Sequence, residues 1–159
     1  MQIRMADEAD LCKIQSLLRA NDLPVEDVSS GLIAGFLIAE SASGSVIGIG
    51  GLEQLGASVL LRSLAVAREA GGTGIARALV ARLEDNARSC GRQDVWLLTT
   101  TAERFFERAG YERVTREDVP AEVQLCRQFV ALCPSTASCM RKRLRTTSSA
   151  PVAERPVSN

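Results

Sequence analysis

The sequence predicts an α+β fold. Apolar runs at 36–40 and 45–52 flank a Ser/Gly turn, as the two strands of an antiparallel hairpin do. A third apolar run at 60–66 follows the turn at Gly56, so that three consecutive strands form a meander. Glycines and an amphipathic helix come directly after the third strand. The chain is therefore expected to combine an antiparallel meander with helices that pack on it.

The N-terminal segment predicts one strand and one helix ahead of the meander. Residues 2–5 form the strand, and Asp7 is a typical helix N-cap with Asp10 three residues later. Apolar residues then recur at helical spacing at Leu11, Ile14, Leu17 and Leu18. Pro24 ends this helix, and a second short helix is predicted over 25–32.

The helix after the glycines is expected to pack against the sheet. Its apolar residues recur every four positions, at Ile75, Leu79, Leu83 and Ala87. Its opposite face is predicted to carry Arg77, Arg82, Glu84, Asp85 and Arg88. The apolar run 95–98 suits a buried strand, and Thr100 with Glu103 predicts a capping box for the helix that Gly110 ends.

The C-terminal part predicts two more strands and a tail. Residues 111–116 and 138–144 are the strands, and an apolar segment at 123–132 between them suits a helix or a collar. Residues 145–159 have almost nothing to bury, so disorder is expected there. The domain is therefore predicted to span 1–144.

Composition excludes several classes of function. The formal net charge is +0, so no global field draws the protein to nucleic acid or to an anionic membrane, and no apolar run is long enough to span a bilayer. Residues 1–8 turn polar early, and a cytoplasmic location is the expectation. The chain contains no histidine, which removes His-dependent triads and most transition-metal sites, and no metal is expected. A general base must then be a carboxylate, a thiolate or water held by polar groups.

The loop at Gly71, Gly72 and Gly74 predicts a phosphate site. Glycines beside a helix start let backbone N–H groups approach an anion closely. A Walker loop is excluded because it needs a lysine, and a Rossmann pattern would need its third glycine where Arg77 stands. An ordinary strand-to-helix turn is the competing interpretation.

The motifs around this loop carry a family resemblance. They are Leu64-Ala65-Val66, then Gly72-Thr73-Gly74-Ile75-Ala76 with its helix, and Phe105-Phe106-Glu107-Arg108-Ala109-Gly110-Tyr111 downstream. The sequence resembles the GCN5-related N-acetyltransferase (GNAT) superfamily. This likeness implies a three-layer fold whose mixed, mostly antiparallel, twisted sheet is flanked by helices.

Within the superfamily the sequence looks most like the N-acetyltransferases encoded with arsenic-resistance genes. Asp22-Leu23-Pro24, Gly51-Leu52-Glu53, Leu61-Arg62-Ser63-Leu64, Leu97-Leu98-Thr99-Thr100-Thr101-Ala102 and Leu132-Cys133-Pro134-Ser135 carry this likeness. It implies transfer of acetyl from acetyl-CoA to the primary amine of a small molecule, such as an amino-acid-like or arsenic-containing toxicant. It leaves a homodimer open.

The resemblance implies two sets of site residues. Acetyl-CoA would be held by Leu64, Ala65, Val66, Gly71, Gly72, Thr73, Gly74, Ile75, Ala76, Thr101 and Phe105. The family usually has Arg or Gln at the position of Gly71, so the loop would bind mainly through its backbone. Glu53 is the predicted base, acting through water, and Ser63 and Thr100 are the predicted catalytic hydroxyls. For these hydroxyls a strand end and helix caps are the alternative.

Three further points stay open from the residues alone. Phe106 stands where the family usually has a tyrosine acid, and a non-catalytic acetyl-CoA sensor is therefore the second hypothesis. Strand alternation puts Arg62 on the same face of its strand as Leu60 and Leu64. A charge among apolar side chains needs a partner, which would be either a substrate anion or a glutamate in an internal ion pair. The thiols of Cys126, Cys133 and Cys139 could bind a metalloid. The simpler alternative is that these cysteines are small apolar residues buried in the core.

Overall fold

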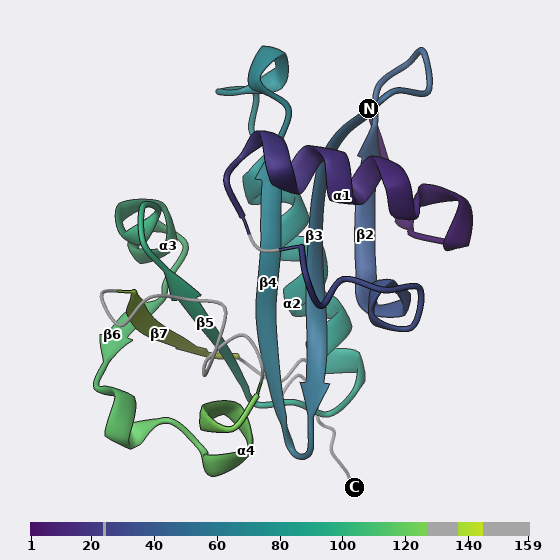
Figure 1. Cartoon of the computed structure of the whole chain (residues 1–159). Helices are drawn as coiled ribbons and strands as arrows, with labels where there is room; N and C mark the ends of the chain where they lie inside the picture. Colours follow the sequence, from purple (N-terminus) through teal and green to yellow (C-terminus); the bar gives the residue numbers. More distant parts are fainter. Residues whose placement is uncertain (24, 127–136, 145–159) are drawn as a thin grey trace, which may run out of the picture.

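The computed structural model describes residues 1–23, 25–126 and 137–144, which form a seven-stranded sheet with helices on both faces (Figure 1). The strands are β1 Gln2–Met5, β2 Phe36–Glu40, β3 Val46–Leu55, β4 Ser58–Val66, β5 Asp94–Thr99, β6 Glu112–Val114 and β7 Ser138–Arg143. Their order in the sheet is β1-β2-β3-β4-β5-β7-β6. Every neighbouring pair is antiparallel except β4 and β5. The predicted α+β fold with a mixed, mostly antiparallel sheet is confirmed.

The helices divide between the two faces of this sheet. They are α1 Leu11–Ala20, α2 Ile75–Ser89, α3 Glu103–Arg108 and α4 Ala121–Gln124, with short 3-10 turns η1 Glu8–Asp10, η2 Leu32–Gly35, η3 Arg68–Ala70 and η4 Arg116–Asp118. Figure 1 shows α1 in front of the sheet and α2 behind it. Side-chain alternation along β2 accounts for the two cores, because Leu37 packs with Leu79 of α2 and Ile38 packs with Ile14 of α1.

The sheet opens between β4 and β5. These two strands pair at Leu60 and Trp96 and then separate toward their C-terminal ends. Figure 1 shows β5 leaning away from β4. Because the two strands are parallel, the residues after Leu60 and after Trp96 lie on either side of the same gap.

A β-bulge in β4 changes which face each residue takes. Ala65 pairs with Ile49 and Arg62 pairs with Gly51, so one extra residue of β4 is accommodated between them. Ser63 has φ 60, in the left-handed region. The bulge turns Leu64 to the α2 face, where it packs against that core, whereas Arg62 lies on the other face. The predicted alternation, which put Arg62 and Leu64 on one face, was therefore wrong.

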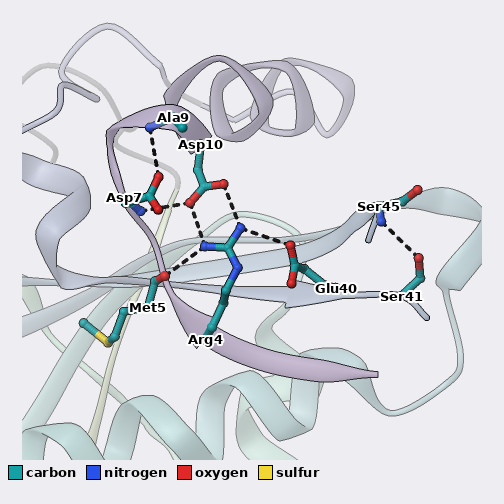
Figure 2. A network of polar contacts seen from close by, with 8 residues as sticks. All are labelled: Arg4, Met5, Asp7, Ala9, Asp10, Glu40, Ser41 and Ser45. Atoms are coloured by element: carbon teal, nitrogen blue, oxygen red, sulfur yellow. Dashed lines mark hydrogen bonds and ion pairs between the residues drawn. The ribbon is translucent and has the colours of Figure 1, made fainter. Parts of the chain in front are cut away.

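A network of ion pairs fixes the N-terminal edge of the sheet (Figure 2). Arg4 of β1 donates to both carboxylate oxygens of Asp10, at 2.8 and 2.9 Å, and to Glu40 of β2 at 3.1 Å. The Asp10 carboxylate also accepts the Asp7 backbone N–H, and the Asp7 carboxylate accepts the Ala9 N–H, both at 2.9 Å. This capping box confirms the predicted N-cap at Asp7.

Asp10 is expected to stabilise the fold only at a pH at which its carboxyl group is ionised. Hydrogen bonds from Arg4 lower the pKa of Asp10 from 3.8 to about 2, although burial opposes the shift. Because the folded pKa lies below the unfolded one, the stabilisation is complete above pH 3.8 and is lost as the pH falls through about 2. Asp10→Asn should lower the free energy of unfolding by about 1 to 2 kcal/mol at pH 7 and by almost nothing near pH 2. Urea unfolding at the two pH values measures this, and an equal loss at both would contradict it.

Two local predictions differ from the structure. Over 25–32 the backbone is helical only from Leu32, where η2 begins. The start of α3 is fixed by Thr99, whose hydroxyl accepts the Ala102 N–H at 3.0 Å, and the predicted Thr100 capping box is not formed. Thr99 thus holds the N-cap residue Ala102 in place, and α3 begins without a side-chain cap.

Glu84 was predicted on the outer face of its helix, but it is buried. Its carboxylate accepts the Tyr111 hydroxyl and the Lys142 ammonium, each at 3.0 Å. Lys142 also donates to the carbonyl of Ala109 at 2.8 Å. β7 and the turn after α3 pack over this side of α2 and bury the carboxylate, which Lys142 neutralises.

Some predictions fall outside the described residues. These are Pro24, Cys133, the rest of the motif 132–135 and the tail 145–159. Among the helices that are described, none has both the length and the apolar character needed to cross a membrane.

Candidate active site

A cavity of about 540 Å³ occupies the gap between β4 and β5. Its wall consists of Leu61, Arg62, Ser63 and Leu64 from β4, Leu97, Leu98, Thr99, Thr100, Thr101 and Ala102 from β5 and the turn after it, Asn21, Asp22, Leu23 and Glu26 from the segment after α1, and Phe106 with Ala137. The wall thus includes Arg62, Ser63, Leu64, Thr100 and Thr101, all of them residues that the sequence predicted for the site.

Arg62 is the most constrained side chain in this wall. The side chain is 1% exposed, and its Nη atoms donate to both carboxylate oxygens of Asp27, at 2.5 and 2.7 Å. Nη1 also donates to Glu53 Oε1 at 3.0 Å, and Nε donates to Ser63 Oγ at 3.2 Å. Burial lowers the pKa of Arg62, but hydrogen bonds and charges from Asp27 and Glu53 outweigh it and hold the pKa above its ordinary value. The internal ion pair left open by the sequence is therefore present, with Asp27 as a second partner.

Glu53 lies behind this wall and contacts the cavity through Arg62. It is on β3, and its side chain is 21% exposed. One carboxylate oxygen, Oε1, accepts from Arg62. A base at this position would reach an amine in the cavity through water, as expected from the sequence, and the catalytic role of Glu53 stays a prediction.

Hydroxyl groups lie on both sides of the gap. Ser63, at the bulge, accepts from Arg62 Nε, while Thr100 and Thr101 are exposed at the end of β5. The bulge interrupts regular pairing between β3 and β4 at Ser63 and Leu64, which have no partner in the register, and the pairing of β4 with β5 is at Leu60, before these residues. Backbone N–H groups at such a position can stabilise an oxyanion.

Phe106 stands where the family usually has a tyrosine, and it has no hydroxyl group that could donate a proton. Phe106 is buried in the cavity wall, with its ring edge-on to those of Phe105 and Tyr111 at centroid distances of 5.0 and 5.4 Å. Tyr111 is the single tyrosine of the chain, and its hydroxyl donates to Glu84. Burial, followed by the charge of Glu84, raises the pKa of Tyr111. No tyrosine hydroxyl therefore lines this cavity.

The glycine loop presents its backbone at the start of α2. Gly72 and Gly74 have φ values of 77 and 83, and Gly74 is the N-cap of α2 without any side-chain cap. Thr73 Oγ1 donates back to the carbonyl of Ala70 at 2.6 Å, so this side chain does not cap the helix either. Residues 71–74 are exposed. The first N–H groups of α2 are thus open to an anion, and the helix dipole favours one.

A family model described as an acetyltransferase (GNAT) domain matches residues 33–113, which is more than half of the 159 residues. The chain belongs to the GNAT acetyltransferase family. The matched segment contains the bulge, the glycine loop, α2 and β5. This match makes the chain a GNAT-type acetyltransferase domain.

Solved structures share this fold. Rv2747 from Mycobacterium tuberculosis, in complex with CoA and NLQ, is 27% identical with a TM-score of 0.79, over 91% of this chain and 100% of that chain. N-acetylglutamate synthase from Neisseria gonorrhoeae, with coenzyme A and N-acetyl-glutamate, is 22% identical with a TM-score of 0.80, over 91% of this chain. The match covers 35% of the synthase, so this GNAT chain spans about a third of it. A GNAT acetyltransferase from Staphylococcus aureus is 14% identical with a TM-score of 0.71, over 91% and 99%. No curated protein matches.

Gly74→Ala is expected to weaken CoA binding about tenfold, because a Cβ strains the left-handed backbone at this N-cap and a shift of that backbone would move the N–H groups. Gly91→Ala is the matched control. Gly91 lies just beyond the other end of α2, and its φ of 78 is close to that of Gly74. A Cβ added at either glycine would meet no atom within 4 Å. Both variants should lose about 1 kcal/mol of stability. Calorimetric titration with CoA measures the difference, and equal CoA affinities in the two variants would contradict the role of the loop.

Sequence reasoning missed the cavity residues that precede β2. Asn21, Asp22 and Glu26 line the wall, and Asp27 holds Arg62. The sequence carried one usable signal, a charged residue inside an apolar strand that requires a partner. It could not single out Asp27, because the pairing joins residues 35 positions apart.

Proposed function

We propose that this GNAT enzyme transfers the acetyl group of acetyl-CoA to the primary amine of a small amino-acid-like molecule. The observation that carries the proposal is Arg62, a buried guanidinium in the wall of the cavity between β4 and β5. A guanidinium fork recognises a carboxylate through two parallel hydrogen bonds. Such a group beside the site of acetyl transfer suits an acceptor that carries a carboxylate near its amine.

Two structural neighbours support this class of acceptor. The synthase from Neisseria gonorrhoeae is in complex with N-acetyl-glutamate, an acetylated amino acid, and Rv2747 is in complex with CoA and NLQ. For this chain, the backbone of loop 71–76 would hold the pyrophosphate of acetyl-CoA. Leu64, Ala65, Val66, Thr101 and Phe105 would hold the rest of the donor, with its thioester reaching the gap.

The reaction that follows is a direct transfer. The amine loses a proton through water to Glu53, its nitrogen attacks the thioester carbon, and the C–S bond breaks. Backbone N–H groups at the bulge stabilise the oxyanion, and Ser63 or Thr100 lies where a hydroxyl could pass a proton from solvent to the departing thiolate. Phe106 supplies no proton, so solvent takes the place of the usual tyrosine.

An arsenic-containing amine is a narrower hypothesis within this class. It rests on the sequence likeness to the arsenic-resistance branch, whereas the family match and the solved structures extend only to the superfamily. An amino-organoarsenical and its phosphorus analogue, assayed side by side, test it. Higher kcat/KM for the arsenical supports the hypothesis, and equal values contradict it.

Release of free CoA thiol tests the proposal against a non-catalytic sensor. The panel consists of amino acids, their decarboxylated amines, amino-organoarsenicals and short peptides. Turnover on amino acids supports the proposed function. Tight binding of acetyl-CoA without turnover on any amine would favour the sensor, to which Phe106 and Gly71 point. The domain limits 1–144, a homodimer and a cytoplasmic location stay predictions.

A further inference from the structure

The contact between Asp27 and Arg62 has the geometry that a substrate carboxylate would adopt. Both carboxylate oxygens of Asp27 bind the two Nη atoms of Arg62, at 2.5 and 2.7 Å. We propose that Asp27 is a specificity-determining residue, which the carboxylate of the acceptor displaces from Arg62 when the acceptor binds. This inference rests on the proposed function, because it takes an amino-acid-like acceptor as given.

Arg62 has little capacity for another anion while Asp27 is in place. Its contacts use one N–H on Nε, two on Nη1 and one on Nη2, which is four of the five that a guanidinium carries. The remaining N–H cannot form a two-point contact. An acceptor carboxylate can therefore be recognised by the fork of Arg62 only in exchange for Asp27.

The exchange discriminates between acceptors because Arg62 is buried. Loss of Asp27 without replacement would leave the guanidinium, whose side chain is 1% exposed, with Glu53 as its one remaining ion-pair partner among the described residues. Removing one partner of a buried pair is strongly unfavourable. An acceptor with a carboxylate restores the same two bonds to Arg62. An amine without a carboxylate restores neither bond and leaves Asp27 in place.

Asp27 is the more accessible partner of this pair. Asp27 lies between the end of α1 at Ala20 and the start of η2 at Leu32, outside any helix or strand, and its neighbour Glu26 is exposed. The side chain of Asp27 is 10% exposed against 1% for that of Arg62, so Asp27 is the partner that already contacts solvent. Glu53 and Ser63 hold the guanidinium from β3 and β4 during the exchange.

The test compares an α-amino acid with its α-carboxamide, for example L-glutamate and its α-amide, by steady-state kinetics. Asp27→Asn keeps the shape of the side chain and removes its charge. We expect the KM for the amino acid to fall about tenfold, because the neutral amide competes weakly for Arg62, and the KM for the α-amide to change less than about twofold. Thermal unfolding checks that the variant is folded.

Asp22→Asn is the matched control. Asp22 is an acidic residue of the cavity wall, five positions before Asp27, and asparagine tolerates its left-handed φ of 57. This variant should shift the KM of both acceptors by the same factor. A selective fall in the KM of the amino acid in Asp22→Asn as well, or equal changes for both acceptors in Asp27→Asn, would overturn the proposal.

A crystal structure of the wild-type protein with CoA and the N-acetyl amino acid gives a test that needs neither turnover nor a variant. Arg62 should bind the carboxylate of the product, with Asp27 turned away. A bound product with Asp27 still on Arg62 would overturn the proposal. Failure of the proposed function looks different, since the wild type would then acetylate no amine in the panel.

Discussion

Glu53→Gln is expected to lower kcat about 100-fold, while the Kd for acetyl-CoA stays within about twofold. A glutamine keeps an oxygen that accepts from Arg62 Nη1, so the contact at 3.0 Å can persist. What the substitution removes is a group able to take the proton of the amine through water. Single-turnover measurement of CoA thiol release, together with calorimetric titration of acetyl-CoA, separates the chemical step from donor binding.

Glu40→Gln is the control for this substitution. Glu40 also accepts from an arginine, Arg4, and its side chain is 24% exposed against 21% for Glu53. It lies on β2, away from the cavity, so its variant should keep full turnover. If the turnover of Glu53→Gln is unchanged, Glu53 is not the base. A water held by the hydroxyls of the cavity wall would then take the proton.

Arg62→Met is expected to cost about 3 kcal/mol of stability. Methionine fills much of the space, but it leaves the carboxylates of Asp27 and Glu53 close together without the cation that both contact. Because Arg62 stays charged throughout the accessible pH range, the loss should persist from neutral to alkaline pH. Urea unfolding of the purified variant measures it.

Two further variants show whether this loss comes from the buried network. Arg4→Met makes the same change at an ion-paired arginine whose side chain is 31% exposed, and it should cost less. The double variant Arg62→Met/Asp27→Asn should recover part of the loss, because one uncompensated charge is removed with its partner. A cost for Arg62→Met no larger than that for Arg4→Met would show that the network contributes little to stability.

The regular elements were predictable because each has a strong local pattern. The apolar runs at 36–40 and 95–98 give β2 and β5 almost to the residue, and the four-residue repeat from Ile75 to Ala87 gives α2. The glycine loop was predictable for the same reason, since helix starts and glycines are local signals. Local patterns also carried the family resemblance, which the match over 33–113 confirms at the level of the superfamily.

The geometry of the site was less predictable because it depends on contacts between distant segments. A one-residue bulge at Ser63 and Leu64 leaves no clear mark in a strand that reads as continuous, yet it moves Leu64 to the opposite face. The partner of Arg62 could be inferred as a carboxylate, but Asp27 is selected by the path of the chain between α1 and η2. Glu84 was misplaced because its burial depends on Lys142, which arrives with β7.

The position of β7 has a consequence for how the protein is made. β7 comes after β6 in the sequence but lies between β5 and β6 in the sheet. Since a nascent chain emerges from the ribosome N-terminus first, the glycine loop 71–74, α2 and β5 emerge before the strand that covers the edge of β5. That edge stays open until residues 138–143 have emerged, and open edges invite pairing with other chains. Protection of this edge of the sheet therefore comes only with the last described strand.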